Sequence, residues 1–486
     1  MRPFFKPGRA KSATGIAGLL LITGLACFSL FAAAPTQLDS SHNPNIQDYL
    51  AFPSQSIALL DVDVLDGSGG PALTRQTVVL SNGRISQIGP VATTIVPEHA
   101  KQLYLPGHTV IPGLVGMHDH THMPGQTFLG EVAARLWLAS GVTTIQTAGS
   151  ADFQAELSLT AAIQRGDMPG PTIFPTAPYL TGPDGNGPMH KPETPAQARQ
   201  LVKDWSAKGA TWFKLYRHIQ PAIAAAVIDE AHKQGRKVTG HLCSLTFSEA
   251  AQMGIDSIEH GLISATDFHP QKSDGQCVSS RQGLAALDIE GEEVAKLIVL
   301  LVEKQVTLTS TLAIIESHFA HRPQGEARSL ALMSEAWQQA YQRRQRQLKN
   351  NASSMPDEVL AKLMAFERRF VQAGGHLVMG PDPGRHVLPG HGNQRGFELL
   401  VEAGFSPPQA LKIATANAAK TLGQAAQFGQ VAIGFNADLV VLKGKLAADA
   451  RVIRNVELVI KQGQVYDPAK LLEGLQGRFG PQLLQD

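Results

Sequence analysis

The feature that most restricts the fold of this chain is a repeated alternation of short apolar strands with longer helical stretches. Helical segments such as 194–209, 220–235 and 246–254 begin with Thr or Gln followed by Pro or Phe and end with Gly, in keeping with helix-capping preferences. The predicted strands lie around Met117 and at residues 141–149, 170–178, 210–217, 237–243, 257–262, 306–313 and 376–382. Eight strand–helix units predict an α/β fold, a (β/α)8 TIM barrel, over residues 113–428.

Residues 56–112 and 429–470 follow a different pattern. Branched residues alternate there with polar ones, and Asp-Gly or Asn-Gly pairs mark turns, which is typical of β-hairpins. We therefore predict a small β-sandwich domain that is built from both segments and flanks the barrel. Residues 35–55 are interpreted as a leader and residues 471–486 as a C-terminal tail.

Residues 1–34 have the layout of a secretory signal peptide. A basic start precedes the apolar run Gly15–Ala34, which ends in small residues, and no acidic residue occurs before Asp39. We predict cleavage near the end of this run and export, so that the protein is periplasmic or secreted. Two alternatives stay open: an uncleaved membrane anchor, for which the run is about long enough, and a lipoprotein modified at Cys27.

The charge of the chain gives no indication of a nucleic-acid partner. There are 42 basic and 41 acidic residues, and removal of residues 1–34 would take away four basic residues and leave 38. No basic stripe with interleaved aromatic residues is found, and the basic run Tyr341–Lys349 is interpreted as a solvated helix face. The expected partner is a small molecule or a small peptide, and oligomerisation is left open.

Two of the three cysteines, Cys243 and Cys277, would remain after export. An oxidising compartment allows them to form a disulfide. Both are expected near the mouth of the barrel, so the pairing is a hypothesis. The alternative is that they are two unrelated thiols.

Residues that can bind metals follow several of the predicted barrel strands. In a barrel of this kind, the C-terminal ends of the strands meet at one mouth, where catalytic residues lie. Imidazole and carboxylate groups together suit Zn²⁺ or a similar divalent ion. His122 falls beyond the first strand and is expected near the ligands rather than among them. The candidates at these strand ends are His118, His120, Lys214, His241, His260 and Asp382.

These residues stand in motifs that resemble the amidohydrolase superfamily, in the branch of imidazolonepropionase-like enzymes and Xaa-Pro dipeptidase-like metallohydrolases. The motifs are VIPGLVGMHDH, GATWFKLYRHI, AHKQGRKVTGHL, GIDSIEHGL, VMGPDPG and GFSPPQALKIATANAAKTLG with the later IGFNADLVVLKG, and the likeness covers roughly residues 56–468. The resemblance implies that His118 and His120 bind one metal and that His241 and His260 bind a second. Asp382 would bind the first metal and act as general base.

The resemblance also implies that Lys214 is carboxylated by CO₂ and bridges the two metals. Burial lowers the pKa of a lysine, which favours the neutral amine that reacts with CO₂. Two divalent ions, with zinc as the expected metal, can share a hydroxide that attacks a carbonyl. Alternatively, Lys214 is an ordinary barrel lysine that neutralises a nearby carboxylate. The expected function is that of an exported metal-dependent hydrolase that cleaves an amide, cyclic amide or small-peptide C–N bond.

The chain departs from the family pattern at several positions. Gly116 stands where the family has an aspartate, the second strand ends in residues 146–149 (QTAG) instead of the usual arginine- and aspartate-containing sequence, and Pro381 and Pro383 flank Asp382. These changes leave the substrate open. The residues considered for substrate binding follow strands three, four and eight: His190, Tyr216, Arg217, His218, Arg385, His386 and His391.

Two other functions remain as alternatives. The same metal pair could hydrolyse a lactone, another ester or an organophosphate, because it activates water in either case. A catalytically inactive barrel could instead serve as a binding protein, although the complete set of predicted ligands argues against this.

Overall fold

The computed structural model describes residues 45–53, 56–123, 125–187, 189–279, 281, 283–323, 326–350 and 355–481. They lie in a unit that runs from Pro44 to Asp486. The predicted signal peptide and most of the predicted leader lie outside the described residues. Within the described part of the chain, no helix combines the length and apolar character needed to cross a bilayer.

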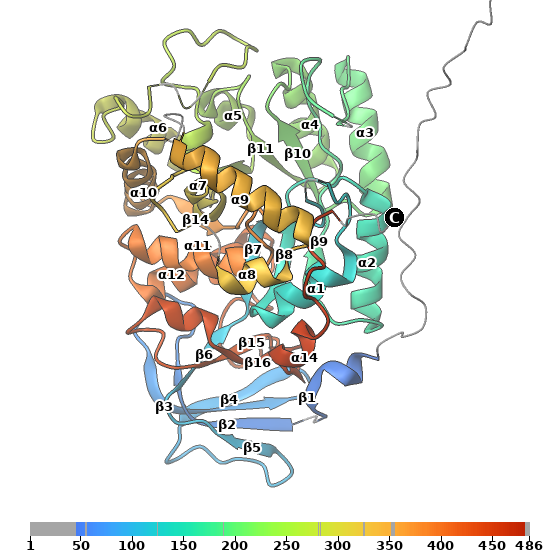
Figure 1. The fold of residues 1–486 in the computed structure, drawn as a ribbon, viewed down its shortest axis with the longest axis vertical. Coiled ribbons are helices and arrows are strands. Elements are labelled where there is room, and N and C mark those ends of the chain that lie inside the picture. The colour runs from blue at the N-terminus through green and yellow to red at the C-terminus, as the bar shows by residue number, and fades with distance from the viewer. Residues whose placement is uncertain are drawn as a thin grey trace, which may run out of the picture. The chain divides into compact units, whose positions relative to one another are not determined.

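Eight parallel strands surround the centre of the larger domain (Figure 1). β7, β8 and β9 form one sheet and β10 to β14 form another, so the predicted barrel is not one continuous hydrogen-bonded sheet. The strands are β7 (Leu114–Asp119), β8 (Val142–Thr147), β9 (Thr172–Phe174), β10 (Trp212–Tyr216), β11 (Lys237–His241), β12 (Ser257–Glu259), β13 (Thr307–Ser310) and β14 (His376–Met379).

Backbone hydrogen bonds join the two sheets where β9 meets β10 and where β14 meets β7; these two junctions are called the seams. Between β9 and β10, two parallel bridges pair Thr176 with Trp212 and Leu180 with Leu215. Between β14 and β7, the N–H of Asp382 donates to the carbonyl oxygen of His118 at 3.0 Å. The eight strands are therefore arranged in the order of a (β/α)8 fold. β9 is short because the residues that follow it pair with β10 only through isolated bridges.

Helices follow most of the strands, and their ends follow capping rules. Thr194 caps α3 with Pro195 at its first turn, and Thr246 and Glu249 form a capping box on α5. The helices that cover the strands are α1 (Gly130–Ala139), α2 (Phe153–Arg165), α3 (Pro195–Lys208), α4 (Pro221–Lys233), α5 (Phe247–Met253), α6 (Glu292–Glu303), α11 (His391–Glu402), α12 (Pro407–Ala414) and α13 (Ala416–Thr421).

Additional helices follow β13. They are α7 (Leu312–Glu316), α8 (Ala327–Leu332), α9 (Glu335–Asn350) and α10 (Asp357–Gln372). The basic run predicted to be a solvated face lies in α9, where residues 341–350 are exposed or half-buried.

The smaller domain is one nine-stranded sheet that unites both ends of the chain. β15 pairs antiparallel with β6, which joins the C-terminal strands to the N-terminal ones. Ile57 and Val78 pack in one core with Val441 and Ile460, so the two halves of the predicted sandwich share a single hydrogen-bonded sheet. Its strands are β1 (Leu50–Phe52), β2 (Ser56–Val64), β3 (Leu73–Ser81), β4 (Arg84–Pro90), β5 (Lys101–Tyr104), β6 (His108–Pro112), β15 (Leu439–Lys443), β16 (Val456–Lys461) and β17 (Gln464–Tyr466).

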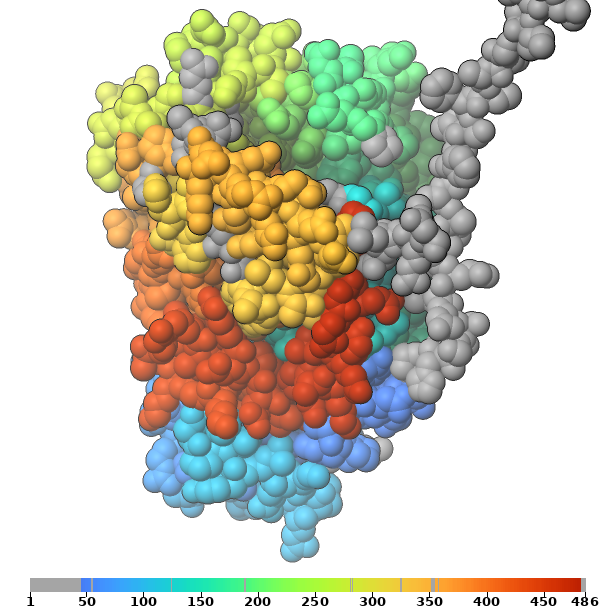
Figure 2. All heavy atoms as spheres, in the orientation of Figure 1, coloured from blue at the N-terminus to red at the C-terminus, as the bar shows by residue number. Residues whose placement is uncertain are grey.

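The C-terminal segment lies between the smaller domain and the extra helices. Figure 2 shows its red surface between the blue N-terminal strands and the yellow-orange α8 and α9. It includes α14 (Pro468–Leu472), and Ser334 at the start of α9 donates its N–H to the carbonyl oxygen of Phe479 at 2.7 Å. The predicted tail is thus packed on the barrel domain as far as the described residues extend.

Candidate metal centre

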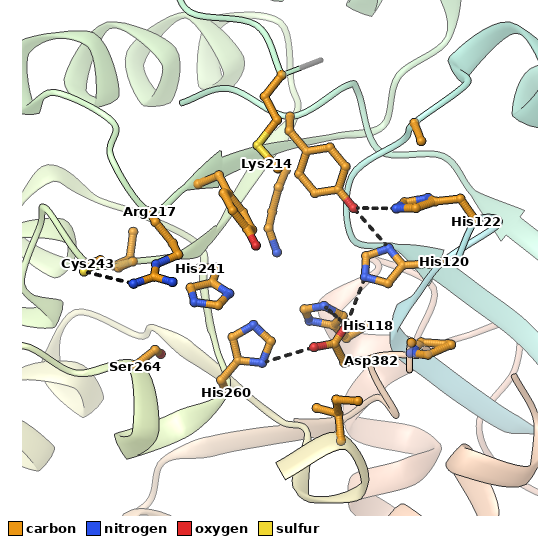
Figure 3. Close-up of a pocket in the computed structure, with 18 of the residues that line it drawn as sticks. His118, His120, His122, Lys214, Arg217, His241, Cys243, His260, Ser264 and Asp382 are labelled. Atoms are coloured by element: carbon orange, nitrogen blue, oxygen red, sulfur yellow. Dashed lines mark hydrogen bonds and ion pairs between the residues drawn. The ribbon is translucent and has the colours of Figure 1, made fainter. Parts of the chain in front are cut away.

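A cavity of about 1140 Å³ lies at the C-terminal ends of the parallel strands. The six predicted ligands all line it: His118, His120, Lys214, His241, His260 and Asp382. In Figure 3 their side chains converge from several strands on one centre. The cavity therefore occupies the position at which a barrel of this kind carries its chemistry.

His118 and His120 reach the cavity from the end of β7. Both are buried, and their Nε2 atoms lie 3.4 Å and 3.1 Å from Oδ1 of Asp382. Burial lowers the pKa of His118 to about 3, so its imidazole is neutral at physiological pH. A neutral imidazole has a lone pair for a metal.

Asp382 follows β14 in a backbone conformation that few non-glycine residues adopt. Its φ is +52°, between Pro381 and Pro383. This turn, together with the hydrogen bond from its N–H to His118, holds the carboxylate against the histidines of β7. Its other oxygen, Oδ2, lies 3.8 Å from Nδ1 of His260.

His241 and His260 form the other side of the centre. Their ring centroids are 4.4 Å apart, and Nδ1 of His260 lies 2.8 Å from the hydroxyl of Thr311. Burial holds the pKa of both imidazoles well below the usual value. Both rings are therefore neutral and available as ligands.

Glu259 is a member of this cluster that the sequence reasoning missed. Its buried carboxylate contacts the amine of Lys214, accepts from the hydroxyl of Thr239 at 2.9 Å, and lies 3.6 Å from Nδ1 of His118. Strand alternation would point Glu259 and His260 in opposite directions. His260 has a φ of +67°, which turns the chain so that both neighbours face the centre.

Lys214 lies on β10 with its amine fully enclosed. Burial lowers its pKa to about 7, with Asp382 acting in the opposite direction. The contact with Glu259 corresponds to the alternative considered for Lys214, a lysine that neutralises a carboxylate. The low pKa is also what carboxylation requires, because the neutral amine is the form that reacts with CO₂.

The donor set fits divalent metal ions. Ligand atoms of His118, His120 and Asp382 lie within 4.8 Å of one another, and so do those of His118, Glu259 and His260. Nδ1 of His118 is buried without a hydrogen-bond partner among the described residues. Imidazoles and carboxylates at such distances are ligands that zinc and similar ions prefer.

Tyr179 and His122 support the ligands from one side. The phenol oxygen of Tyr179 lies 3.1 Å from Nε2 of His122 and 3.4 Å from Nδ1 of His120. His122 thus contacts a neighbour of the ligands, as expected from its place beyond the strand (Figure 3). Tyr179 was missed because it follows β9 outside any motif.

Asp119 occupies the space left by the missing aspartate at position 116. A Cβ atom on Gly116 would lie 1.8 Å from Oδ2 of Asp119. That carboxylate is buried and accepts hydrogen bonds from the indole of Trp137 at 2.8 Å and the amide of Asn393 at 3.0 Å. The support for β7 comes here from a residue between the two histidines.

Of the seven residues considered for substrate binding, four line the cavity, whereas His218, His386 and His391 do not. His190, Tyr216, Arg217 and Arg385 line the cavity. His391 does not: it is buried in α11, where its Nδ1 lies 2.8 Å from the hydroxyl of Ser329. It lines a different pocket, which it shares with His386, because α11 begins after the chain has turned away from the mouth.

Cys243 and Cys277 form a disulfide in the structure. It ties the chain just after β11 to the long loop between β12 and α6. Nη2 of Arg217 lies 3.9 Å from the sulfur of Cys243 and 3.8 Å from that of Cys277. Figure 3 shows the contact with Cys243. The hypothesis of a disulfide at the mouth is thus preferred over two unrelated thiols.

Comparison with known proteins agrees with the geometry. The model of the amidohydrolase family matches residues 109–466, whereas no curated protein matches the chain. Among solved structures, a candidate prolidase from Bifidobacterium longum is 26% identical, with a TM-score of 0.63, over 87% of this chain and 99% of its own.

Two further solved structures share the fold. A Xaa-Pro dipeptidase with bound methionine is 21% identical, with a TM-score of 0.61, over 85% of this chain and 100% of its own. A molinate hydrolase is 19% identical, with a TM-score of 0.64, over 90% of this chain and 99% of its own. These similarities extend over nearly all of the described chain.

Proposed function

Because the chain belongs to the amidohydrolase family, and is thus a hydrolase that acts on carbon–nitrogen bonds, we propose that it cleaves an amide bond at a binuclear metal centre. The observation that carries this proposal is the convergence of four histidines, Asp382 and Lys214 on one cavity. The proposed substrates are small amides, cyclic amides or dipeptides. The solved structures that it resembles include a candidate prolidase and a Xaa-Pro dipeptidase.

The ligand assignment follows the two sides of the cavity. His118, His120 and Asp382 would hold one ion, and His241 and His260 would hold a second. Carboxylated Lys214 would join the two. Bound zinc or a similar ion would lower the pKa of water and polarise the scissile carbonyl.

Asp382 is the proposed general base. One carboxylate oxygen contacts His120, and the other faces His260 toward the centre of the cavity. It accepts a proton from the attacking water and then delivers it to the leaving nitrogen, so that the amide becomes a carboxylic acid and an amine. Tyr216, beside His241 at a ring distance of 5.1 Å, is placed to hold the substrate against the base.

Export is part of the same proposal. The basic and apolar segments of residues 1–34 support a signal peptide, and the Cys243–Cys277 disulfide supports an oxidising compartment. Expression of the full chain in a Gram-negative host, followed by N-terminal sequencing of the periplasmic fraction, tests it. A protein that stays cytoplasmic with residues 1–34 attached would contradict export.

The hydrolytic function is tested with protein purified without chelators. We expect about two divalent ions per chain by elemental analysis and turnover in a screen of N-acyl amino acids, Xaa-Pro and other dipeptides, and cyclic amides. Asp382→Asn should lower kcat by at least about a hundredfold. Full activity of this variant, or turnover of lactones and phosphotriesters but of no amide, would overturn the proposal.

A further inference from the structure

Three arginines line one part of the cavity without a carboxylate partner. Arg217 follows β10, Arg281 lies between β12 and α6, and Arg385 follows β14. No ion pair between described residues involves any of them. Of the described residues that line the cavity, Asp152 and Asp382 alone are acidic, and Asp152 caps α2 by accepting from the N–H of Ala155.

His318 holds two of these arginines together. Its Nδ1 lies 3.2 Å from the carbonyl oxygen of Ile315, so this nitrogen carries the proton. Its Nε2 is then an acceptor, and it contacts both Nη1 of Arg385 and Nη2 of Arg281, the latter at 3.4 Å. Burial, Arg385 and Arg281 lower the pKa of His318 to about 3, which keeps it neutral.

The third arginine belongs to the same group. After burial, the charges of Arg385 and Arg217 are the main causes that lower the pKa of Arg281, so Arg281 lies within the field of both. The disulfide that contacts Arg217 also anchors the loop that carries Arg281. Arg385 stands in a tight turn between Gly384 and Val387, with a φ of +52°.

These contacts leave most of the guanidinium donors available. Each arginine has five N–H donors, and each of the contacts with His318 or the disulfide uses one terminal nitrogen. All three residues keep part of their surface exposed, so a ligand in the cavity can reach them. Three like charges from separate loops repel one another, and an anion would remove this repulsion.

Three arginines are more than a single carboxylate group would need as partners. One carboxylate pairs with one guanidinium through two parallel hydrogen bonds. Three guanidinium groups therefore match a ligand with more than one anionic group. A purely structural role explains the contacts with His318 and the disulfide, but it does not explain why no acidic residue balances the charge.

We propose that Arg217, Arg281 and Arg385 form an anion-binding wall, and that the preferred substrates are amides of acidic amino acids, which carry two carboxylates. This inference rests on the proposed amide hydrolysis. The leaving amino acid would be aspartate or glutamate. Arg385 is three residues from Asp382, which places the wall beside the proposed general base.

The test compares Ala-Glu with Ala-Gln, which differ only in the side-chain carboxylate. We expect kcat/KM of the metal-loaded enzyme to be at least about tenfold higher for Ala-Glu, because hydrogen bonds to a charged group are lost with Ala-Gln. Arg281→Gln should lower kcat/KM for Ala-Glu at least about tenfold more than for Ala-Gln. Arg281→Lys should restore part of the preference.

A matched control and a binding measurement complete the design. Arg451→Gln removes an exposed arginine outside the cavity and should leave both rates unchanged. A thermal-shift measurement compares the binding of L-glutamate with that of L-glutamine and does not depend on turnover. If no amide is hydrolysed, the proposed function fails, but the thermal shifts still test the anion-binding wall. Equal rates for the two dipeptides, equal losses in Arg281→Gln, or equal thermal shifts for the two amino acids would overturn the anion-binding wall.

Discussion

Asp119 takes the place of the aspartate that the family has at the position of Gly116. Its carboxylate fills the space above Gly116 and accepts two hydrogen bonds from outside the strand. Because Asp119 lies between His118 and His120, this anchor fixes the part of β7 that presents both histidines. Gly116 and Asp119 should therefore depend on each other.

A double-mutant cycle tests this dependence. Asp119→Ala leaves the indole N–H of Trp137 and the amide of Asn393 unpaired, and we expect it to lower the free energy of unfolding by about 3 kcal/mol. Gly116→Ala should cost about 2 kcal/mol, because its new Cβ collides with the Asp119 carboxylate. In urea unfolding, the double variant should lose at least about 1 kcal/mol less than the sum. Additive losses would contradict a shared space.

Tyr179 and Tyr216 are neighbouring phenols with different predicted roles. Their rings meet edge to face at 5.6 Å, but only Tyr179 has hydrogen bonds to His120 and His122 in the described structure. Tyr179→Phe should weaken metal binding about tenfold or more, because groups that orient ligands affect metal affinity. Tyr216→Phe should raise KM and leave metal affinity nearly unchanged. Chelator competition measures the affinity, and equal weakening in both variants would refute the distinction.

At the scale of elements, the strands could be predicted from the sequence and the contacts between their loops could not. Hydrophobic runs separated by capped helices predict β7 to β14 because each strand is local in sequence. His118 and Asp382 could be placed because strand ends meet at one mouth. Glu259 could not, since the left-handed turn at His260 has no sequence signal. Arg281 lies in a long loop without periodicity, and its contact with His318 is purely tertiary.

The loop between β12 and α6 is the element with the strongest single constraint. The disulfide closes a segment with a sequence separation of 34 between Cys243 and Cys277. Closing a loop of that length is expected to stabilise the fold by about 3–4 kcal/mol. A reductant should thus lower the melting temperature by about 4 °C. The double variant Cys243→Ser, Cys277→Ser should melt at the reduced temperature and show no response to the reductant; an unchanged melting temperature of the wild-type protein would show that the bridge carries no stability.

At the scale of the whole molecule, two features depend on contacts between segments that are distant in the sequence: the nine-stranded sheet of the smaller domain and the junctions between the two sheets of the larger domain. The alternation of branched and polar residues predicted strands at both ends of the chain. That these strands form one small domain was inferred only from the similarity of the two patterns. The pairing of β15 with β6 is what unites them. The eight strands form two sheets because neither β9 and β10 nor β14 and β7 are joined by a continuous ladder, and this pairing could not be read from their apolar sequences.

Glu367 makes the stability of the whole molecule depend on pH. It is buried in α10, close to Gly261, and burial raises its pKa to about 8 although the nearby Ser310 acts in the opposite direction. The folded state therefore holds a proton that the unfolded state releases above the ordinary glutamate pKa of 4.5. The contribution of this group is fully present below that value and is lost as the pH rises toward 8.

Glu367→Gln removes this proton without removing the side chain. Relative to the wild-type protein, the variant should gain stability steadily between pH 5 and pH 8, by a total on the order of a few kcal/mol. Urea unfolding of both proteins at several pH values measures the difference, which cancels the contribution of all groups that the two share. Glu303→Gln, at the end of α6, is the matched control, because this carboxylate is exposed and its replacement should give a nearly constant difference. A difference that is also constant for Glu367→Gln would mean that the buried carboxyl titrates alike in the folded and unfolded states.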